Sequence, residues 1–403
     1  MANGTNGADN LVAEKVAQAK EVLRELDVDL WLLAGRETAE MPDPSFPLVV
    51  GTSVTWTSLF LIGRNGEHLA IVGTGDVENV KGTGAWPEVA GYVQAFREEL
   101  LRALDRFQPR QIALNYSTDN VVADGLAHGV YLLLEEALEG TPYAGRFVSA
   151  EPIVSRVRGR KSPAELARIR EAVRLTVEMF DRLTAILRPG ITEREMADFM
   201  HRQVREAGLE ATAWDPHYCP TVSAGPESPW GHVTPGDIAL QPGHLLRLDF
   251  GVKYEGYCSD LQRTWYLLRP GEEDAPEECK RTFALVDRCI QEGARALTPG
   301  RLGYEVDAVA RGIFEEAGLR WDFGFGHQLG RHVHDGNALL GPRWERYGQR
   351  PYDPVEVGHV YTLEIGTRLP DYGVCMLEED VVVTPNGAEF LAPPQREMIL
   401  VRG

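Results

Sequence analysis

The first 155 residues alternate between the apolar period of helices and the short apolar runs of strands. Apolar residues recur at helical spacing over 11–26, and the continuous apolar run over 29–35 predicts a buried strand. Two further runs flank the turn residues Arg64 to Glu67 and predict a β-hairpin. Together with helix signals at 96–107 and 130–140 and a strand signal at 111–117, these runs predict an α/β domain with a mixed sheet over 11–155. We expect residues 1–10 to be disordered.

A second domain is predicted over 160–403. Ser162 and Pro163 suit the N-cap and the first position of a long amphipathic helix. Further on, eight residues recur at a single offset of 110 positions, each time where one helix ends at Pro-Gly and the next closes on Ala-Gly-Leu. Thr192 and Glu195 also fit a capping box. The repeat predicts a duplicated half-domain: Leu187, Pro189, Gly190, Glu195, Glu206, Ala207, Gly208 and Leu209 match Leu297, Pro299, Gly300, Glu305, Glu316, Ala317, Gly318 and Leu319.

Each predicted half carries a hairpin with two acidic residues. In the first, a turn at Lys253 to Gly256 would place Asp249 directly opposite Asp260, with Cβ atoms about 5 Å apart. In the second, a Leu-Pro-Asp-Tyr-Gly turn would place Glu364 opposite Glu378. Each half is therefore expected to present one pair of facing carboxylates.

Two such pairs among apolar residues indicate a metal centre. Facing carboxylates repel each other, and burying them is unfavourable by several kcal/mol unless cations neutralise them. Four carboxylates and one imidazole suit two divalent ions about 3.5–4 Å apart with a bridging water of lowered pKa. Hard oxygen ligands favour Mn²⁺ first, with Co²⁺, Zn²⁺ or Fe²⁺ as alternatives.

The imidazole is expected from a histidine near the same sheet. The segment 324–336 contains three, and its glycines allow the backbone to approach a site closely. His327 and His334 share neither a strand face nor neighbouring helical positions, so we expect them to have separate roles. His332 alternates with His334, and we interpret it as structural. His232 lies in a loop just before the first carboxylate hairpin.

Composition narrows the functional classes. The chain is 43% apolar and 25% charged, which is typical of a folded globular protein, and its net charge is -19. This charge disfavours nucleic acid and anionic membranes as partners. The N-terminus lacks the features of a signal peptide, and five scattered cysteines indicate reduced thiols, so we expect a cytoplasmic protein.

At these residues the sequence resembles the creatinase, aminopeptidase P, prolidase and methionine aminopeptidase family, peptidase family M24, and within it the Xaa-Pro peptidases. LDFGVKYEGYCSDLQRTW, GHQLGRHVHD, TLEIG and LEEDVVVT carry the resemblance. It implies an α+β fold in which a creatinase-type α/β N-terminal domain precedes a duplicated pita-bread catalytic domain. It also implies a homodimer. Short substrates are implied as well, because the N-terminal domain of similar proteins covers the site.

The resemblance assigns a role to each candidate residue. Glu364 would also move a proton during catalysis, and His232 and His334 would flank the substrate, orient its carbonyl and stabilise the tetrahedral intermediate. Glu378 is preferred over Glu379, the fallback, because it keeps the six-residue spacing to Thr384 and mirrors Glu364. The implied metal ligands are Asp249, Asp260, His327, Glu364 and Glu378.

Three positions depart from the family pattern. Ile365 replaces a proline, Asp335 replaces a glutamate, and Met376 replaces the arginine that prolidases and aminopeptidases P carry two residues before the second Glu. The metal ligands are unaffected by these changes. Selectivity for an Xaa-Pro bond is less strongly implied.

Three functional hypotheses follow. The leading one is an Xaa-Pro type aminopeptidase or dipeptidase, in which a hydroxide bridging two metals attacks a peptide bond near the N-terminus of a short peptide. The second is a metal-dependent hydrolase of a small non-peptide amide. The third, a non-catalytic binding module, is disfavoured because all five ligands are retained.

Overall fold

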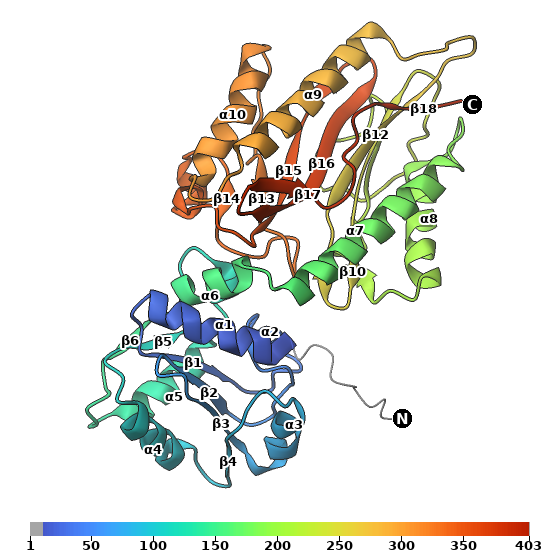
Figure 1. Cartoon of the computed structure of the whole chain (residues 1–403). Coiled ribbons are helices and arrows are strands. Elements are labelled where there is room, and N and C mark those ends of the chain that lie inside the picture. The colour runs from blue at the N-terminus through green and yellow to red at the C-terminus, as the bar shows by residue number, and fades with distance from the viewer. Residues whose placement is uncertain (1–10, 403) are drawn as a thin grey trace. The chain divides into compact units, whose positions relative to one another are not determined.

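The computed structural model describes residues 11–402, so the disorder expected for residues 1–10 lies outside the described residues. The chain divides into two compact units that meet between Arg158 and Gly159 (Figure 1). The predicted domain limits of 11–155 and 160–403 stay a prediction.

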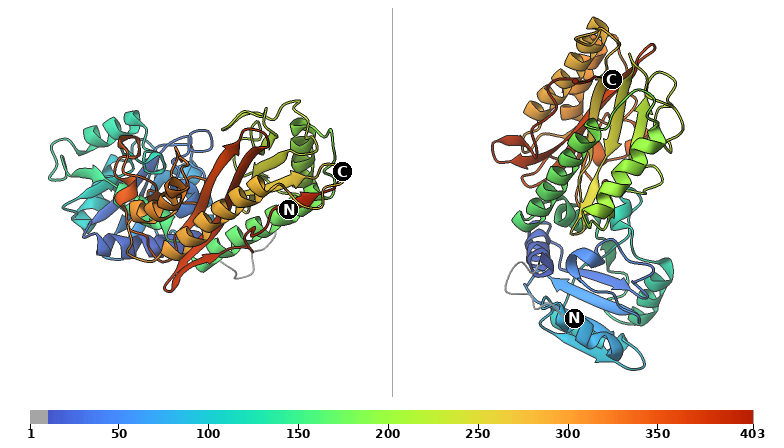
Figure 2. Two further views of the ribbon diagram at one scale, coloured as in Figure 1. Left: turned by 90° about the horizontal axis from the view of Figure 1, so that it is seen from above. Right: turned by 90° about the vertical axis from the view of Figure 1, so that its right-hand side faces the viewer.

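The first unit is a six-stranded mixed sheet covered by helices on both faces (Figures 1 and 2). The strand order is β4-β3-β2-β1-β5-β6. The strands are β1 (Leu30–Gly35), β2 (Ser58–Gly63), β3 (His68–Gly73), β4 (Val89–Tyr92), β5 (Ile112–Leu114) and β6 (Phe147–Ser149). The helices are α1 (Leu11–Glu25), α2 (Phe46–Val49), α3 (Val77–Gly82), α4 (Arg97–Phe107), α5 (His128–Leu138) and α6 (Glu151–Gly159). The predicted hairpin, the first strand and the three long helix or strand signals are confirmed.

Alternation along β1 explains why both faces of this sheet are covered. Trp31 and Leu33 belong to a core that includes apolar residues of α1, α2 and α6. Leu30 and Leu32 belong to the other core, with apolar residues of α4 and α5. Successive strand residues point to opposite faces, so a strand that is apolar throughout requires cover on both sides.

The second unit contains a larger antiparallel sheet with the path β15-β16-β12-β9-β8, extended by β17 on β16 and β18 on β12. Two smaller sheets, β11-β10-β7 and β13-β14, accompany it. The helices are α7 (Pro163–Thr184), α8 (Glu193–Glu206), α9 (Glu277–Ala296) and α10 (Gly303–Glu316). The strands are β7 (Ala211–Thr212), β8 (Thr221–Ala224), β9 (Leu245–Phe250), β10 (Val252–Tyr254), β11 (Tyr257–Cys258), β12 (Leu261–Leu267), β13 (Gly326–His327), β14 (Leu339–Leu340), β15 (Val360–Leu369), β16 (Gly373–Thr384), β17 (Gly387–Phe390) and β18 (Ile399–Val401).

The local signals for the helices of this unit are confirmed. Ser162 caps α7 with Pro163 in its first turn, and Thr192 and Glu195 form the predicted capping box of α8. Helices α8 and α10 each have 14 residues, and their ends are related by the same offset as the sequence repeat.

Helices α7 and α9 pack on one face of the large sheet (Figure 1). Phe180 of α7 contacts the rings of Phe250 and Trp265. Apolar residues of α9 share a core with Leu363 and Leu377. Since residues on a strand alternate, the acidic residues next to these apolar ones point to the opposite face.

The predicted centre of the first hairpin is wrong by one residue, so the partner of Asp249 is shifted by two positions. Asp249 pairs with Gln262, not with Asp260. The cause is the turn: Glu255 and Gly256 both have positive φ, 45° and 81°, and form a two-residue connection centred one residue beyond the expected point. Asp260 lies two residues before Gln262, so it keeps the same face but sits diagonally to Asp249.

The second hairpin has the predicted register, with Glu364 directly opposite Glu378. All five cysteines are free and buried, which agrees with the expected reduced thiols. Within residues 11–402, none of the helices combines the length and the apolar character needed to cross a bilayer.

Candidate metal centre

One row of side chains crosses the large sheet and forms the base of the candidate site. It runs over five neighbouring strands as Thr221, Asp249, Gln262, Glu378 and Glu364. Directly paired residues share a face of the sheet, so three carboxylates and one amide of this row point the same way. The structure thus brings together three of the four predicted acidic ligands through strand pairing alone.

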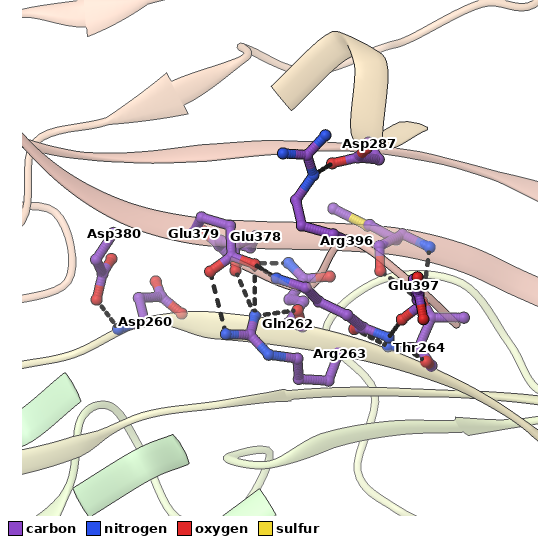
Figure 3. A network of polar contacts seen from close by, with 12 residues as sticks. Asp260, Gln262, Arg263, Thr264, Asp287, Glu378, Glu379, Asp380, Arg396 and Glu397 are labelled. Atoms are coloured by element: carbon purple, nitrogen blue, oxygen red, sulfur yellow. Dashed lines mark hydrogen bonds and ion pairs between the residues drawn. The ribbon is translucent and has the colours of Figure 1, made fainter. Parts of the chain in front are cut away.

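Asp260 adds the fourth carboxylate from the residue just before β12. Its backbone N–H donates a hydrogen bond to Asp380 Oδ2 at 3.0 Å, which connects the start of β12 to β16 (Figure 3). The side chain is almost fully buried. Asp380 therefore acts as a support for the position of Asp260.

His327 enters from the short strand β13. Its N–H donates to Thr362 Oγ1 at 3.3 Å, and a Cβ on the preceding Gly326 would lie 1.9 Å from the carbonyl oxygen of Thr362. Only glycine permits this approach of β13 to β15. The expectation that glycines bring this segment close to the site is confirmed at Gly326.

The imidazole faces three carboxylates at distances that suit a shared cation. His327 Nε2 lies 3.7 Å from Asp260 Oδ2, 3.7 Å from Glu378 Oε1 and 4.0 Å from Glu364 Oε1. Ligand atoms of Asp260, His327 and Glu378 all lie within 4.8 Å of one another. This geometry fits one divalent ion placed between them.

Unpartnered polar atoms give a second indication of a bound cation. Asp249 Oδ1, Asp260 Oδ1 and His327 Nδ1 are buried and have no hydrogen-bond partner. Buried polar groups without partners are unfavourable, and a metal ion would satisfy the two carboxylate oxygens. The donor set of four carboxylates and one imidazole therefore fits divalent metal, as the sequence predicted.

The shifted pKa values of the cluster also indicate a bound cation. Burial and the nearby carboxylate of Asp249 raise the pKa of Glu364 to about 8. Burial, followed by repulsion from neighbouring carboxylates, raises the pKa values of Asp260 and Glu378 well above their ordinary range. Burial lowers the pKa of His327 well below its ordinary value. Without cations these acids hold protons more tightly than ordinary carboxyl groups, so metal ions and protons compete for them.

The two adjacent glutamates of β16 have different surroundings (Figure 3). Glu378 accepts a hydrogen bond from Gln262 Nε2 at 2.6 Å and faces His327. Glu379 points to the helix face, where it is paired with Arg263 at 2.9 and 3.1 Å and accepts the Gln395 N–H at 2.7 Å. This arrangement favours Glu378 over Glu379 as a ligand.

The other predicted histidines lie around the cluster. The ring centre of His334 is 4.4 Å from that of His327, with the planes nearly perpendicular. Although His334 reaches solvent, surrounding protein atoms desolvate it and lower its pKa, and the positive charges of His232 and Arg350 add to this effect. His232 stacks near the Tyr218 ring, 6.2 Å between centres.

The three departures from the family pattern have different surroundings. Ile365 is fully buried in the core on the helix face. Asp335 accepts a hydrogen bond from the Arg331 N–H and so shapes the loop. Met376 is 5% exposed and lies two residues before Glu378 on β16. His332, interpreted as structural, is exposed.

Sequence reasoning missed four residues of the site. Arg247, Gln262 and Asp380 each lie two residues from a predicted ligand, so the strand period of two could have placed them on the same face as that ligand. Arg350 carried no such signal. It is close enough to affect the pKa of His334 only once the loop before β15 is folded.

Comparisons with known proteins agree with this geometry. The sequence model described as "Metallopeptidase family M24" matches residues 167–385, more than half of the chain. An uncharacterised peptidase of Bacillus subtilis is 29% identical over 250 residues, which span 62% of this chain and 66% of that protein. An uncharacterised peptidase of Staphylococcus saprophyticus is 27% identical over 335 residues, 82% of this chain and 86% of that protein.

Solved structures share the fold over nearly the whole chain. An Xaa-Pro dipeptidase from Bacillus anthracis has a TM-score of 0.74 and 22% identity, covering 97% of this chain and 100% of that one. An X-Pro aminopeptidase from Thermotoga maritima has a TM-score of 0.73 and 24% identity, covering 94% and 100%. The predicted fold class, an N-terminal α/β domain followed by a pita-bread catalytic domain, is confirmed.

The raised pKa of Glu364 predicts how pH affects the metal-free protein. Its pKa is about 8 in the folded protein, against an ordinary value of 4.5. Between these pH values the folded state holds a proton that the unfolded state has lost, so this group's stabilising contribution is complete below pH 4.5 and is lost as pH rises toward 8. Glu364→Gln cannot titrate, so in chelator-treated protein its Tm should rise relative to wild type by about 2 °C or more over this window.

Thermal unfolding of the wild type and of Glu364→Gln, measured over a series of pH values, checks this predicted difference in Tm. Added Mn²⁺ should raise the wild-type Tm most at the high-pH end, where the carboxylates are free to bind. A Tm difference between the two proteins that stays constant with pH would show that Glu364 is not protonated in the metal-free fold.

Proposed function

Because the chain belongs to metallopeptidase family M24, we propose that it hydrolyses a peptide bond near the N-terminus of short peptides, as an Xaa-Pro aminopeptidase or dipeptidase. The observation that carries this proposal is the convergence of Asp260, His327 and Glu378 within 4.8 Å of one another. Asp249 and Glu364 complete the set on the same face of the sheet.

We propose that these five residues bind two divalent ions, with Mn²⁺ as first choice and Co²⁺, Zn²⁺ or Fe²⁺ as alternatives. When bound, such ions supply Lewis acidity and lower the pKa of water toward neutrality. The unpartnered oxygens of Asp249 and Asp260 support this assignment. The homodimer and the cytoplasmic location expected from the sequence stay predictions.

Glu364 is proposed to move the proton during hydrolysis. Burial and the nearby carboxylate of Asp249 raise its pKa to about 8 in the metal-free protein, which supports a role in proton transfer near neutral pH. Cations beside it favour the carboxylate form, which can accept a proton from the attacking water and donate it to the leaving amine. Glu364 lies at the end of the row, and 21% of its side chain is exposed, compared with 3% for Glu378, so it is the more accessible of the two.

His232 and His334 are proposed to orient the scissile carbonyl. The lowered pKa of His334 keeps its ring neutral at physiological pH, so one ring nitrogen donates and the other accepts. A neutral donor beside the cluster can stabilise negative charge that develops on the carbonyl oxygen. His232 lies close enough to affect the pKa values of both Asp249 and His334, so it borders the same space.

One residue, Met376, favours a second candidate function, the hydrolysis of a small non-peptide amide. Met376 is buried two residues from Glu378, and a thioether cannot provide the cationic donors of an arginine. The metal-binding residues do not distinguish the two substrates. Met376 is therefore the residue on which the choice depends.

The proposed roles predict opposite effects of two substitutions. Asp260→Asn should lower both metal content and activity, because it removes the charge of a ligand. His334→Ala should keep its metal and lose activity by about 10²- to 10⁴-fold, the range for a positioned proton-transfer or electrostatic group. Elemental analysis of the purified proteins, together with peptide hydrolysis rates, separates the two effects.

His332→Ala serves as the matched control, since this neighbouring histidine is exposed and has no proposed role in metal binding or catalysis. It should retain both metal and activity. Loss of metal from His334→Ala would contradict the assignment of His327 as the only histidine ligand.

Because Met376 stands where prolidases and aminopeptidases P carry arginine, we predict weak selectivity for proline after the scissile bond. We expect kcat/KM for Ala-Pro to exceed that for Ala-Ala and Met-Ala by much less than 10³-fold, and Met376→Arg to increase the ratio. Dipeptide hydrolysis by the Mn²⁺-loaded protein measures it. A wild-type preference of about 10³-fold or more would show that Met376 does not limit selectivity, and no activity on any dipeptide would favour the non-peptide amide.

A further inference from the structure

Helix α10 carries a buried ion pair between Asp307 and Arg311, one turn apart. Arg311 donates two hydrogen bonds to the carboxylate of Asp307, at 2.7 and 2.8 Å. The side chain of Asp307 is 2% exposed and that of Arg311 is 12% exposed. None of the five proposed ligands lies on this helix. Both side chains nevertheless reach the backbone that leads to His327.

The pair makes three contacts to the backbone just before β13. The Arg311 guanidinium donates to the carbonyl oxygens of Trp321 and Phe323 through Nη1 and Nη2. Asp307 Oδ1 accepts the N–H of Phe325 at 3.2 Å. One guanidinium and one carboxylate therefore hold every second residue of this short segment.

Phe325 connects the ion pair to the candidate metal centre. Its carbonyl oxygen accepts the backbone N–H of Glu364, the residue proposed to move the proton, at 2.7 Å. His327, the proposed imidazole ligand, follows two residues later on β13. A shift of the Phe325 peptide would therefore move His327 or break the hydrogen bond to the Glu364 backbone.

The sequence repeat places this pair in one half of the domain only. Helices α8 and α10 are equivalent at the offset of 110 positions, and Asp307 and Arg311 then correspond to Ala197 and His201. Ala197 has no charge with which to form an ion pair. The first half thus forms the same helix without the pair, and that half supplies no histidine ligand. A requirement of the helix fold alone would apply to both halves.

The energetics of a buried ion pair also argue for a role beyond stability. Desolvation of the two charges offsets most of their attraction, so well-packed apolar side chains of similar volume are often equally stabilising. Apolar side chains cannot bond to the backbone of a neighbouring segment, however. A guanidinium and a carboxylate provide several hydrogen bonds of fixed direction at once.

We propose that Asp307 and Arg311 are positioning residues that set the places of His327 and Glu364, and thereby the affinity of the centre for a divalent ion. Both act through the peptide of Phe325 and are not themselves ligands. This inference rests on the proposed function and adds to it two residues outside the carboxylate cluster. Outer residues that orient metal ligands change affinity by about 10- to 100-fold.

Calorimetric titration of the chelator-treated full chain with Mn²⁺ tests the proposal. Asp307→Asn keeps the shape of the side chain but removes the charge that holds Arg311, so the affinity for Mn²⁺ should fall by about 10- to 100-fold. Co²⁺ provides a second readout that does not depend on catalysis. Its visible absorption reports the arrangement of its ligands, so the spectrum of Co²⁺-loaded Asp307→Asn should differ from that of the wild type.

Asp43→Asn is the matched control. Asp43 lies in the first unit, is 3% exposed and accepts the backbone N–H of Ser45 at 2.7 Å, so it is also a buried carboxylate that holds a peptide group. Its substitution should leave both the Mn²⁺ affinity and the Co²⁺ spectrum unchanged, even where it lowers the Tm.

Arg311→Lys provides a second test in case Asp307→Asn does not fold. Lysine keeps the positive charge beside Asp307, but its single nitrogen cannot reproduce the fork that binds the carboxylate and two carbonyl oxygens together. The Mn²⁺ affinity of Arg311→Lys should therefore fall by about tenfold.

Two results would overturn the proposal. Wild-type Mn²⁺ affinity and an unchanged Co²⁺ spectrum in both Asp307→Asn and Arg311→Lys would show that the pair does not position the ligands. An equal loss of affinity in Asp43→Asn would show that metal binding merely follows overall stability. Absence of Mn²⁺ binding by the wild type would instead contradict the proposed metal-dependent function itself.

Discussion

The repulsion among four buried carboxylates is the constraint on which the centre of this molecule depends. Three of them lie in one row across paired strands, and the fourth, Asp260, lies diagonally beside them. Burial raises the pKa of all four, and repulsion from neighbouring carboxylates adds to this effect at Asp260, Glu364 and Glu378. Such a cluster is stable only with protons, an internal cation or metal. Arg247 offsets one negative charge through its ion pair with Asp249, and divalent ions would offset the negative charge of the other carboxylates.

The surrounding fold keeps this charge apart from the hydrophobic core. Alternation along β16 sends Glu378 into the site and Glu379 to the helix face, where Arg263 neutralises it at 2.9 Å. The guanidinium of Arg263 in turn lies 5.8 Å from the centre of the Phe180 ring on α7. A one-residue shift of register on β16 would exchange these two acids, and each would meet the wrong partner. The register of the hairpin therefore decides which of the two acids faces His327.

Much of this arrangement could be predicted from the sequence, because the relevant signals were local. Capping boxes such as Ser162 with Glu165, and the facing pair of Glu364 and Glu378, depend only on nearby residues and on a symmetric turn. The first hairpin was misplaced by one residue because Glu255 adopts positive φ, which the sequence gives no reason to expect of glutamate. Arg247 lies on the same face of β9 as Asp249, but its second partner, Gln262, lies on β12 across the register that had been misplaced, so its contacts were not recognised.

The placement of a cation between Asp260, His327 and Glu378 is the central claim, and anomalous diffraction from crystals grown with Mn²⁺ measures it most directly. The account predicts that the strongest anomalous peak lies within coordination distance of all three side chains, about 2.0–2.3 Å from their ligand atoms. Well-ordered side chains with no peak among these three residues, in crystals that contain Mn²⁺, would contradict the account.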